Sequence, residues 1–113
     1  MHELSLAMSV MDIVVQEAQA NNAKKIKEVV IEVGELAGVE PICFRTAIDA
    51  VIASSKYPQM KATIIDVPGS GECTECGTQF SAKDRIAICP NCGSWACRVT
   101  GGEVFRVESI IIE

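Results

Sequence analysis

Apolar side chains recur every three or four positions in the first part of the sequence, from Leu4 to Ala18. This spacing places them on one face of a helix, so the pattern predicts an amphipathic helix that ends near Asn21. The face expected to be buried consists of Leu4, Ala7, Met8, Met11, Val14, Val15 and Ala18. A second helical pattern begins at Pro41, where the missing N–H costs nothing in a first turn, and continues to about Ser54. Its apolar positions are Phe44, Ala47, Ile48 and Val51.

Three further segments alternate between apolar and polar residues, which predicts strands at 26–33, 60–67 and 104–113. The first two flank the second helix, and a strand–helix–strand unit of this kind places its strands parallel. The last segment is too apolar for a free tail, so we expect it to return to the same sheet. The predicted fold is α/β (α+β), with a small mixed three-stranded sheet, two helices and a module inserted at 69–102.

The inserted module holds two Cys-x-x-Cys pairs, Cys73 with Cys76 and Cys89 with Cys92, separated by twelve residues. Each pair puts two thiolates on one turn, and two such turns together form the tetrahedral four-sulfur cage that Zn²⁺ prefers. Four thiolates leave no open position for water, so the expected zinc is structural rather than catalytic.

Other interpretations of the four cysteines are a disulfide pair, a thioredoxin-like redox motif and a rubredoxin-like iron site. The paired arrangement argues against the first two, and iron stays open because Cys-Pro-x-Cys-Gly also suits it. We expect Phe80 and Trp95 to cover the site. Of the remaining cysteines, Cys43 is expected in the core, and Cys97 is expected to be either a core residue or a spare thiol.

Composition narrows the classes of partner. Ten basic residues against fifteen acidic ones give a formal charge of −5, which disfavours nucleic acids and anionic membranes. Basic and acidic residues balance within 69–102, so the predicted ribbon lacks the basic face of a nucleic-acid-binding module. No apolar run reaches the roughly 20 residues of a membrane span. We therefore expect a cytoplasmic protein with no membrane insertion, in which reduced thiols favour metal binding over disulfides.

The first three residues, Met1-His2-Glu3, form a second candidate site. The α-amine, the His2 backbone amide and the His2 imidazole follow one another along the chain. If the amide loses its proton, these nitrogens can close a five-membered and a six-membered ring around one metal. Nitrogen-rich planar donation suits Ni²⁺ or Cu²⁺. A solvated, disordered chain start is the alternative, and the chemistry alone leaves it open.

Four features occur together along the chain. Met-His-Glu-Leu-Ser-Leu runs into a helix, Ile-Glu-Val-Gly-Glu-Leu is followed by Val-Glu, two Cys-x-x-Cys pairs lie near the C-terminus, and the length is 113 residues. In this combination the sequence resembles the HypA/HybF family of metallochaperones, which help to insert nickel into [NiFe]-hydrogenase. The resemblance implies that Met1, His2 and Glu3 bind nickel and that Cys73, Cys76, Cys89 and Cys92 bind structural zinc.

The chain pattern predicts the domain division, and the resemblance adds the metal of each domain and the partners. Residues 1–68 and 103–113 are expected to form the nickel-binding α/β domain, and residues 69–102 the zinc-binding ribbon domain. The implied partners are a nickel-handling maturation GTPase (HypB-like) and the hydrogenase large-subunit precursor. Some family members carry histidines beside the zinc cysteines, whereas His2 is the only histidine here. We therefore expect no histidine-based pH response through the zinc site.

The favoured function is a nickel metallochaperone without enzymatic turnover. The alternative is a zinc-ribbon adaptor or nucleic-acid-binding module with no nickel function. In such a protein, loss of zinc would abolish function and replacement of His2 would have no effect. An enzyme is not expected, because the sequence offers no evident pair of nucleophile and base.

Overall fold

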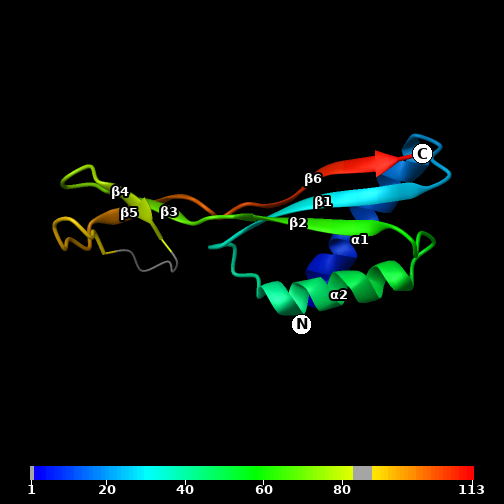
Figure 1. The fold of residues 1–113 in the computed structure, drawn as a ribbon, viewed down its shortest axis with the longest axis horizontal. Coiled ribbons are helices and arrows are strands. Elements are labelled where there is room, and N and C mark those ends of the chain that lie inside the picture. Colours follow the sequence, from blue (N-terminus) through cyan, green and yellow to red (C-terminus); the bar gives the residue numbers. More distant parts are fainter. Residues whose placement is uncertain (1, 83–87) are drawn as a thin grey trace. The chain divides into compact units, whose positions relative to one another are not determined.

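The computed structural model of the chain describes residues 2–82 and 88–113, which form two helices and six strands (Figure 1). The helices are α1 (His2–Ala20) and α2 (Pro41–Ala53), and the strands are β1 (Ile26–Gly34), β2 (Lys61–Val67), β3 (Ser70–Cys73), β4 (Gln79–Ser81), β5 (Cys97–Gly101) and β6 (Phe105–Ile112). They form two three-stranded sheets, ordered β2-β1-β6 and β4-β3-β5. Neither helix within the described ranges is long and apolar enough to cross a membrane.

The chain divides into two compact units. The first, here called the helical unit, comprises Met1–Ile31, Val39–Ile65 and Arg106–Glu113. The second, here called the cysteine unit, comprises Glu32–Gly38 and Asp66–Phe105. Strands β1, β2 and β6 each contribute residues to both units. The assignment of nickel and zinc to separate domains stays a prediction.

The helical unit has an aliphatic core between the helices and the sheet. Both helices lie on the same side of β1, β2 and β6 (Figure 1). The buried residues of the two helices are Ala7, Val10, Met11, Val14 and Ala18 in α1, and Phe44, Ile48 and Ile52 in α2. Val29 and Ile31 of β1 are fully buried, so the sheet supplies the facing layer of this core.

Two sequence-based assignments of buried residues are wrong in detail. Leu4 and Met8 were expected on the buried face of α1, but they are 44% and 54% exposed, while Val10 is only 2% exposed. The apolar stripe is wider than the surface that the sheet and α2 can cover, so its outer edge stays in solvent. Cys43, expected in the core, is exposed on the first turn of α2.

The last strand returns to the first sheet, as expected. Glu113 donates its N–H to the Lys25 carbonyl at 2.9 Å, and Lys25 donates its N–H to the Glu113 carbonyl at 3.5 Å. Two residues that exchange both backbone bonds face each other in an antiparallel pair. Strand β6 is therefore antiparallel to β1 and forms one edge of the sheet.

Strands β1 and β2 run in the same direction. The Thr63 hydroxyl donates to the Glu28 carboxylate in the early parts of the two strands, and Glu35 N–H donates to the Val67 carbonyl at 2.8 Å near their ends. Because the residue numbers of the bonded residues increase together along both strands, the two strands are parallel. The sheet is therefore mixed, which confirms the predicted fold class.

The last residue of β1 and the turn that follows it, residues 34–36, belong to the cysteine unit and are here called the base clasp. Leu36 donates its N–H to the Gly102 carbonyl at 2.6 Å, on the outgoing side of the inserted segment. The Glu35 carboxylate accepts the Gly69 N–H at 2.9 Å, on the incoming side. The base clasp therefore holds both ends of the inserted segment, a role that the sequence did not indicate.

Strand β3 is the centre of the ribbon and pairs antiparallel with β4 and β5. Phe80 lies opposite Gly71, and a side chain at Gly71 would meet its ring at 3.1 Å. Trp95 is 70% exposed, so the expectation that it covers the cysteine site is wrong. Cys73 and Cys89 are nevertheless buried, at 1% and 2% exposed.

Candidate metal centres

The two Cys-x-x-Cys segments fold into the same turn. Gly77 donates its N–H to the Cys73 carbonyl at 3.0 Å, and Gly93 donates its N–H to the Cys89 carbonyl at 2.9 Å. In each turn the N–H of the first cysteine is bonded to the carbonyl five residues later. The glycines have φ of +79° and +72°, a region in which other residues are strained. Glycine is therefore strongly favoured at the position after each pair.

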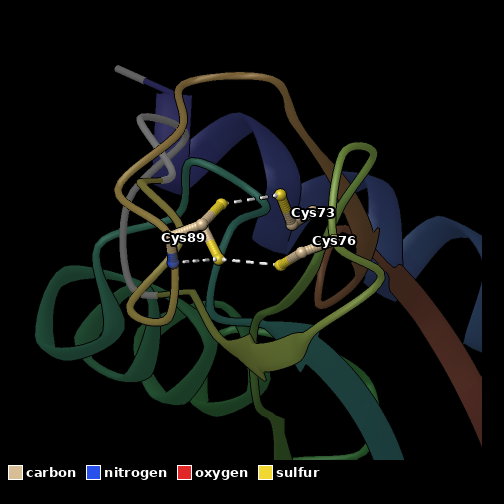
Figure 2. Close-up of side chains that lie close together, drawn as sticks. Cys73, Cys76 and Cys89 are labelled. Atoms are coloured by element: carbon tan, nitrogen blue, oxygen red, sulfur yellow. Dashed lines mark hydrogen bonds between the residues drawn. The ribbon is translucent and has the colours of Figure 1, made fainter.

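The turns bring four sulfur atoms together, and Figure 2 shows the sulfurs of Cys73, Cys76 and Cys89 in one cluster. Cys73 Sγ lies 3.6 Å from Cys92 Sγ, and Cys76 Sγ lies 3.5 Å from Cys89 Sγ. All four sulfurs lie within 4.8 Å of one another. A tetrahedron with metal–sulfur bonds of about 2.3 Å has edges of about 3.8 Å, so the cage has the dimensions for zinc.

Hydrogen-bond donors surround the sulfurs and favour their ionised form. Cys89 Sγ accepts the backbone N–H groups of Asn91 and Cys92, each at 3.4 Å. The Thr78 hydroxyl lies 3.1 Å from Cys76 Sγ. This hydroxyl, the Thr78 backbone N–H and the Asn91 amide lower the pKa of Cys76 to about 6. At least one thiolate is therefore available at neutral pH.

The four thiols cannot all ionise easily without a cation. The Ser94 backbone N–H favours the Cys92 thiolate, but the neighbouring sulfurs of Cys89 and Cys73 and burial outweigh it and raise the pKa of Cys92 to about 12. A divalent cation among the sulfurs would offset this repulsion, because metal binding displaces the thiol protons. The donor set fits a divalent metal that prefers thiolates.

Cys97 lies beside this cluster without belonging to it. It faces Cys73 across β3 and β5, and its Sγ donates to the Ser94 carbonyl at 3.5 Å. Burial, together with the charge of the Cys73 thiolate, raises the pKa of Cys97. Cys97 is therefore a neutral, half-buried thiol at neutral pH, in keeping with the spare-thiol interpretation.

The second candidate centre is at the start of α1. Met1 lies outside the described residues, and His2 is the first residue of the helix. The His2 side chain is 63% exposed, and its Nδ1 lies 3.6 Å from Glu3 Oε2. The imidazole is therefore open to an incoming metal, with one carboxylate beside it.

Glu3 connects the starts of the two helices. Its Oε2 accepts the Glu40 N–H at 3.3 Å, and the Glu40 carboxylate in turn accepts the Cys43 N–H at 2.6 Å as the N-cap of α2. Sequence reasoning missed Glu40. The signal was a glutamate directly before Pro41 at the first helical position, since an acidic side chain there can cap the helix.

The charge on Glu3 is maintained by this contact. The Glu40 N–H is the largest cause that lowers the pKa of Glu3 below its usual 4.5. A carboxyl group whose pKa is lower in the folded than in the unfolded protein stabilises the fold at pH values above its unfolded pKa. This stabilisation is lost as the pH falls through the folded pKa. We predict that Glu3→Gln lowers the melting temperature of the metal-free protein at pH 7, and that this difference is lost progressively as the pH falls below 4.5.

The control is Glu17→Gln, which neutralises an exposed glutamate of the same helix. Melting curves for the three proteins between pH 7 and pH 3 provide the comparison. Equal acid sensitivity of Glu3→Gln and the wild type would contradict the proposed Glu3–Glu40 contact.

Comparison with known proteins places these features in context. A family model described as "HypA: Hydrogenase/urease nickel incorporation, metallochaperone, hypA" matches residues 1–112. The hydrogenase maturation factor HypA of Chlorobium luteolum is 38% identical over 113 residues, covering 100% of this chain and 97% of that protein. The solution structure of the Ni metallochaperone HypA from Helicobacter pylori has a TM-score of 0.64 at 25% identity, covering 97% of this chain and 96% of that one. Another HypA solution structure has a TM-score of 0.69 at 26% identity, covering 100% and 97%.

Proposed function

The chain belongs to the HypA family of hydrogenase/urease nickel-incorporation metallochaperones, and from this premise we propose that it carries Ni²⁺ to the large-subunit precursor of a [NiFe]-hydrogenase. The observation that carries the proposal is the family match over residues 1–112, which includes both candidate metal centres. Metallochaperones transfer metal without chemical turnover, so no catalytic residue is proposed.

We assign the transported nickel to the start of the chain. Met1, His2 and Glu3 would supply nitrogen and oxygen donors, with the exposed imidazole of His2 as the accessible ligand. A short chelate at an exposed helix start suits capture and release, because a partner can approach it without unfolding the core. The amine and amide must lose protons to bind, so nickel affinity should fall as pH falls.

Glu40 supports this assignment from the neighbouring helix. Its N–H holds the Glu3 carboxylate at 3.3 Å, which restricts Glu3 to one side of His2. A side chain held in place loses less conformational entropy when it binds a ligand. Glu40 is therefore proposed as a positioning residue for the nickel centre.

We assign structural zinc to Cys73, Cys76, Cys89 and Cys92. The sulfur separations of 3.5 and 3.6 Å support a tetrahedral ion with bonds near 2.3 Å. Such an ion would hold the two turns of the cysteine unit together and would have no open position for substrate. Iron in the same cage is distinguished by the colour of the purified protein.

The proposed partners follow from the role of the family in hydrogenase maturation. They are a nickel-handling maturation GTPase, which would release or receive nickel, and the hydrogenase large-subunit precursor, which would accept it. Co-purification of either protein with this chain provides the direct measurement.

Nickel titration tests the assignment of the N-terminal centre. The zinc-loaded protein with a native N-terminus is compared with His2→Ala and with a variant extended by one residue before Met1. We expect one nickel site in the native protein and at least about tenfold weaker binding in both variants, because each removes a donor of the chelate. Isothermal titration calorimetry measures the affinity, and absorption spectroscopy reports planar nickel.

Lys24→Ala serves as the control, since it changes an exposed residue in the segment between α1 and β1. If the native protein, His2→Ala and the extended variant bind nickel equally, the assignment of nickel to the chain start is wrong. If loss of zinc in a cysteine variant abolishes function while His2→Ala leaves function unchanged, the zinc-ribbon adaptor is favoured instead.

A further inference from the structure

A pocket in the helical unit is lined by four lysines that take no part in either metal centre. Its volume is about 300 Å³, and its walls are residues 24–27, where β1 begins, and residues 56–60, between α2 and β2. The four lysines are Lys24, Lys25, Lys27 and Lys56. Two segments about thirty residues apart in sequence thus form one basic surface.

This concentration of charge is unusual for the chain. The sequence has ten basic and fifteen acidic residues, and four of the ten basic residues line this one pocket. The other six basic residues are outnumbered by the fifteen acidic ones across the rest of the sequence. A local positive field on an acidic protein attracts anionic groups selectively to that surface.

The floor of the pocket is apolar and held in position. Ile26 and Met60 are only 4% and 6% exposed. The turn that carries the wall residue Tyr57 is fixed, since Tyr57 N–H donates to Ser55 Oγ at 3.0 Å and Met60 N–H donates to the Tyr57 carbonyl at 3.1 Å. The pocket therefore combines a basic rim with an apolar base, which suits a ligand that carries both kinds of group.

One carboxylate of the chain already pairs with this rim. Lys27 Nζ lies 3.2 Å from Glu113 Oε1, and the Lys24 backbone N–H donates to the Glu113 carbonyl at 3.0 Å. An extended segment with an acidic side chain is thus accommodated beside the pocket. Within the described part of the chain, the ammonium groups of Lys24, Lys25 and Lys56 have no carboxylate partner.

We propose that this lysine pocket docks an acidic peptide segment of a partner protein, with an apolar side chain on the floor and carboxylates on the lysines. A phosphate ligand fits less well, because both walls follow helix C-termini, whereas phosphate sites use helix N-termini and glycine-rich loops. The apolar floor would also contribute nothing to a small inorganic anion. This docking does not depend on nickel, so its failure and that of the proposed function are distinguishable.

The test uses the full-length, zinc-loaded chain and a fluorescein-labelled peptide in which glutamates flank one leucine. Fluorescence anisotropy at low ionic strength measures binding. We expect Lys56→Glu to weaken binding about tenfold, because it removes one ion pair and adds a repulsion. Lys61→Glu changes the net charge equally but lies outside the pocket, and it should change the affinity less than about twofold.

Three further measurements separate the alternatives. Replacing the leucine of the peptide by glycine should weaken binding, and nickel should leave it unchanged. If Lys61→Glu weakens binding as much as Lys56→Glu, only net charge is involved and the proposal is overturned. If inorganic phosphate at equal concentration displaces the peptide, the pocket is a small-anion site. If no peptide binds, the lysines only offset the helix C-terminal dipoles. Either of these results also overturns the proposal.

Discussion

We expect that replacing Cys89 by serine removes the proposed structural metal and unfolds the cysteine unit. Cys89 is 2% exposed, its sulfur lies 3.5 Å from that of Cys76, and it accepts two backbone N–H groups within its own turn. Structural zinc in small modules contributes on the order of 10–16 kcal/mol of apparent binding energy at neutral pH. A three-sulfur site should bind zinc at least about a hundredfold more weakly.

Metal analysis and a chromogenic chelator measure the zinc content and its rate of release. Amide hydrogen exchange should show lost protection in β3, β4 and β5, while α1 and α2 keep theirs because their buried faces lie in the helical unit. Cys97→Ser is the matched control, since this half-buried thiol is outside the four-sulfur cluster. Retention of zinc with unchanged affinity in Cys89→Ser would refute the four-cysteine site.

Replacing Gly34 by alanine will destabilise the protein by about 3 kcal/mol, because the base clasp has no space for a side chain. A Cβ at Gly34 would lie 2.1 Å from the Gly102 carbonyl oxygen and 2.9 Å from the Val104 nitrogen. Both neighbours are backbone atoms, and Gly34 N–H also donates to the Val104 carbonyl at 2.6 Å. Relief of the clash must therefore break the clasp.

Gly38→Ala provides the contrast for this prediction. Gly38 has φ of +77°, but an added Cβ would meet nothing within 4 Å. Alanine at this position is destabilising only through the strain of the left-handed backbone, which costs about 1 kcal/mol. Chemical denaturation of the zinc-loaded proteins measures both values, and equal effects of the two substitutions would show that close packing in the clasp is not the cause.

The base clasp is close in sequence to Glu40. Only three residues separate Leu36, which is bonded within the cysteine unit, from Glu40, whose N–H donates to Glu3.

The sequence predicted the elements of the fold because their signals are local. The helical period in α1 and α2, the alternation in β1 and β6, and proline at the start of α2 depend on residues within a few positions of one another. The paired cysteines are equally local, since each turn is closed by its own backbone bonds and its own glycine. These features were confirmed with boundaries shifted by a few residues.

Only the tertiary structure decided which parts of those elements are buried and which distant residues meet. Periodicity gave an apolar stripe on α1, but packing exposed Met8 and buried Val10, because the width of the covered face depends on the sheet and α2. The contact of Glu3 with Glu40 joins residues 37 positions apart, and the lysine pocket joins two similarly separated segments. Such contacts follow from how the elements pack, which no local pattern encodes. The sequence by itself therefore determined the helices, the strands and the paired cysteine turns, and the fold determined which residues support the candidate sites and where the basic surface lies.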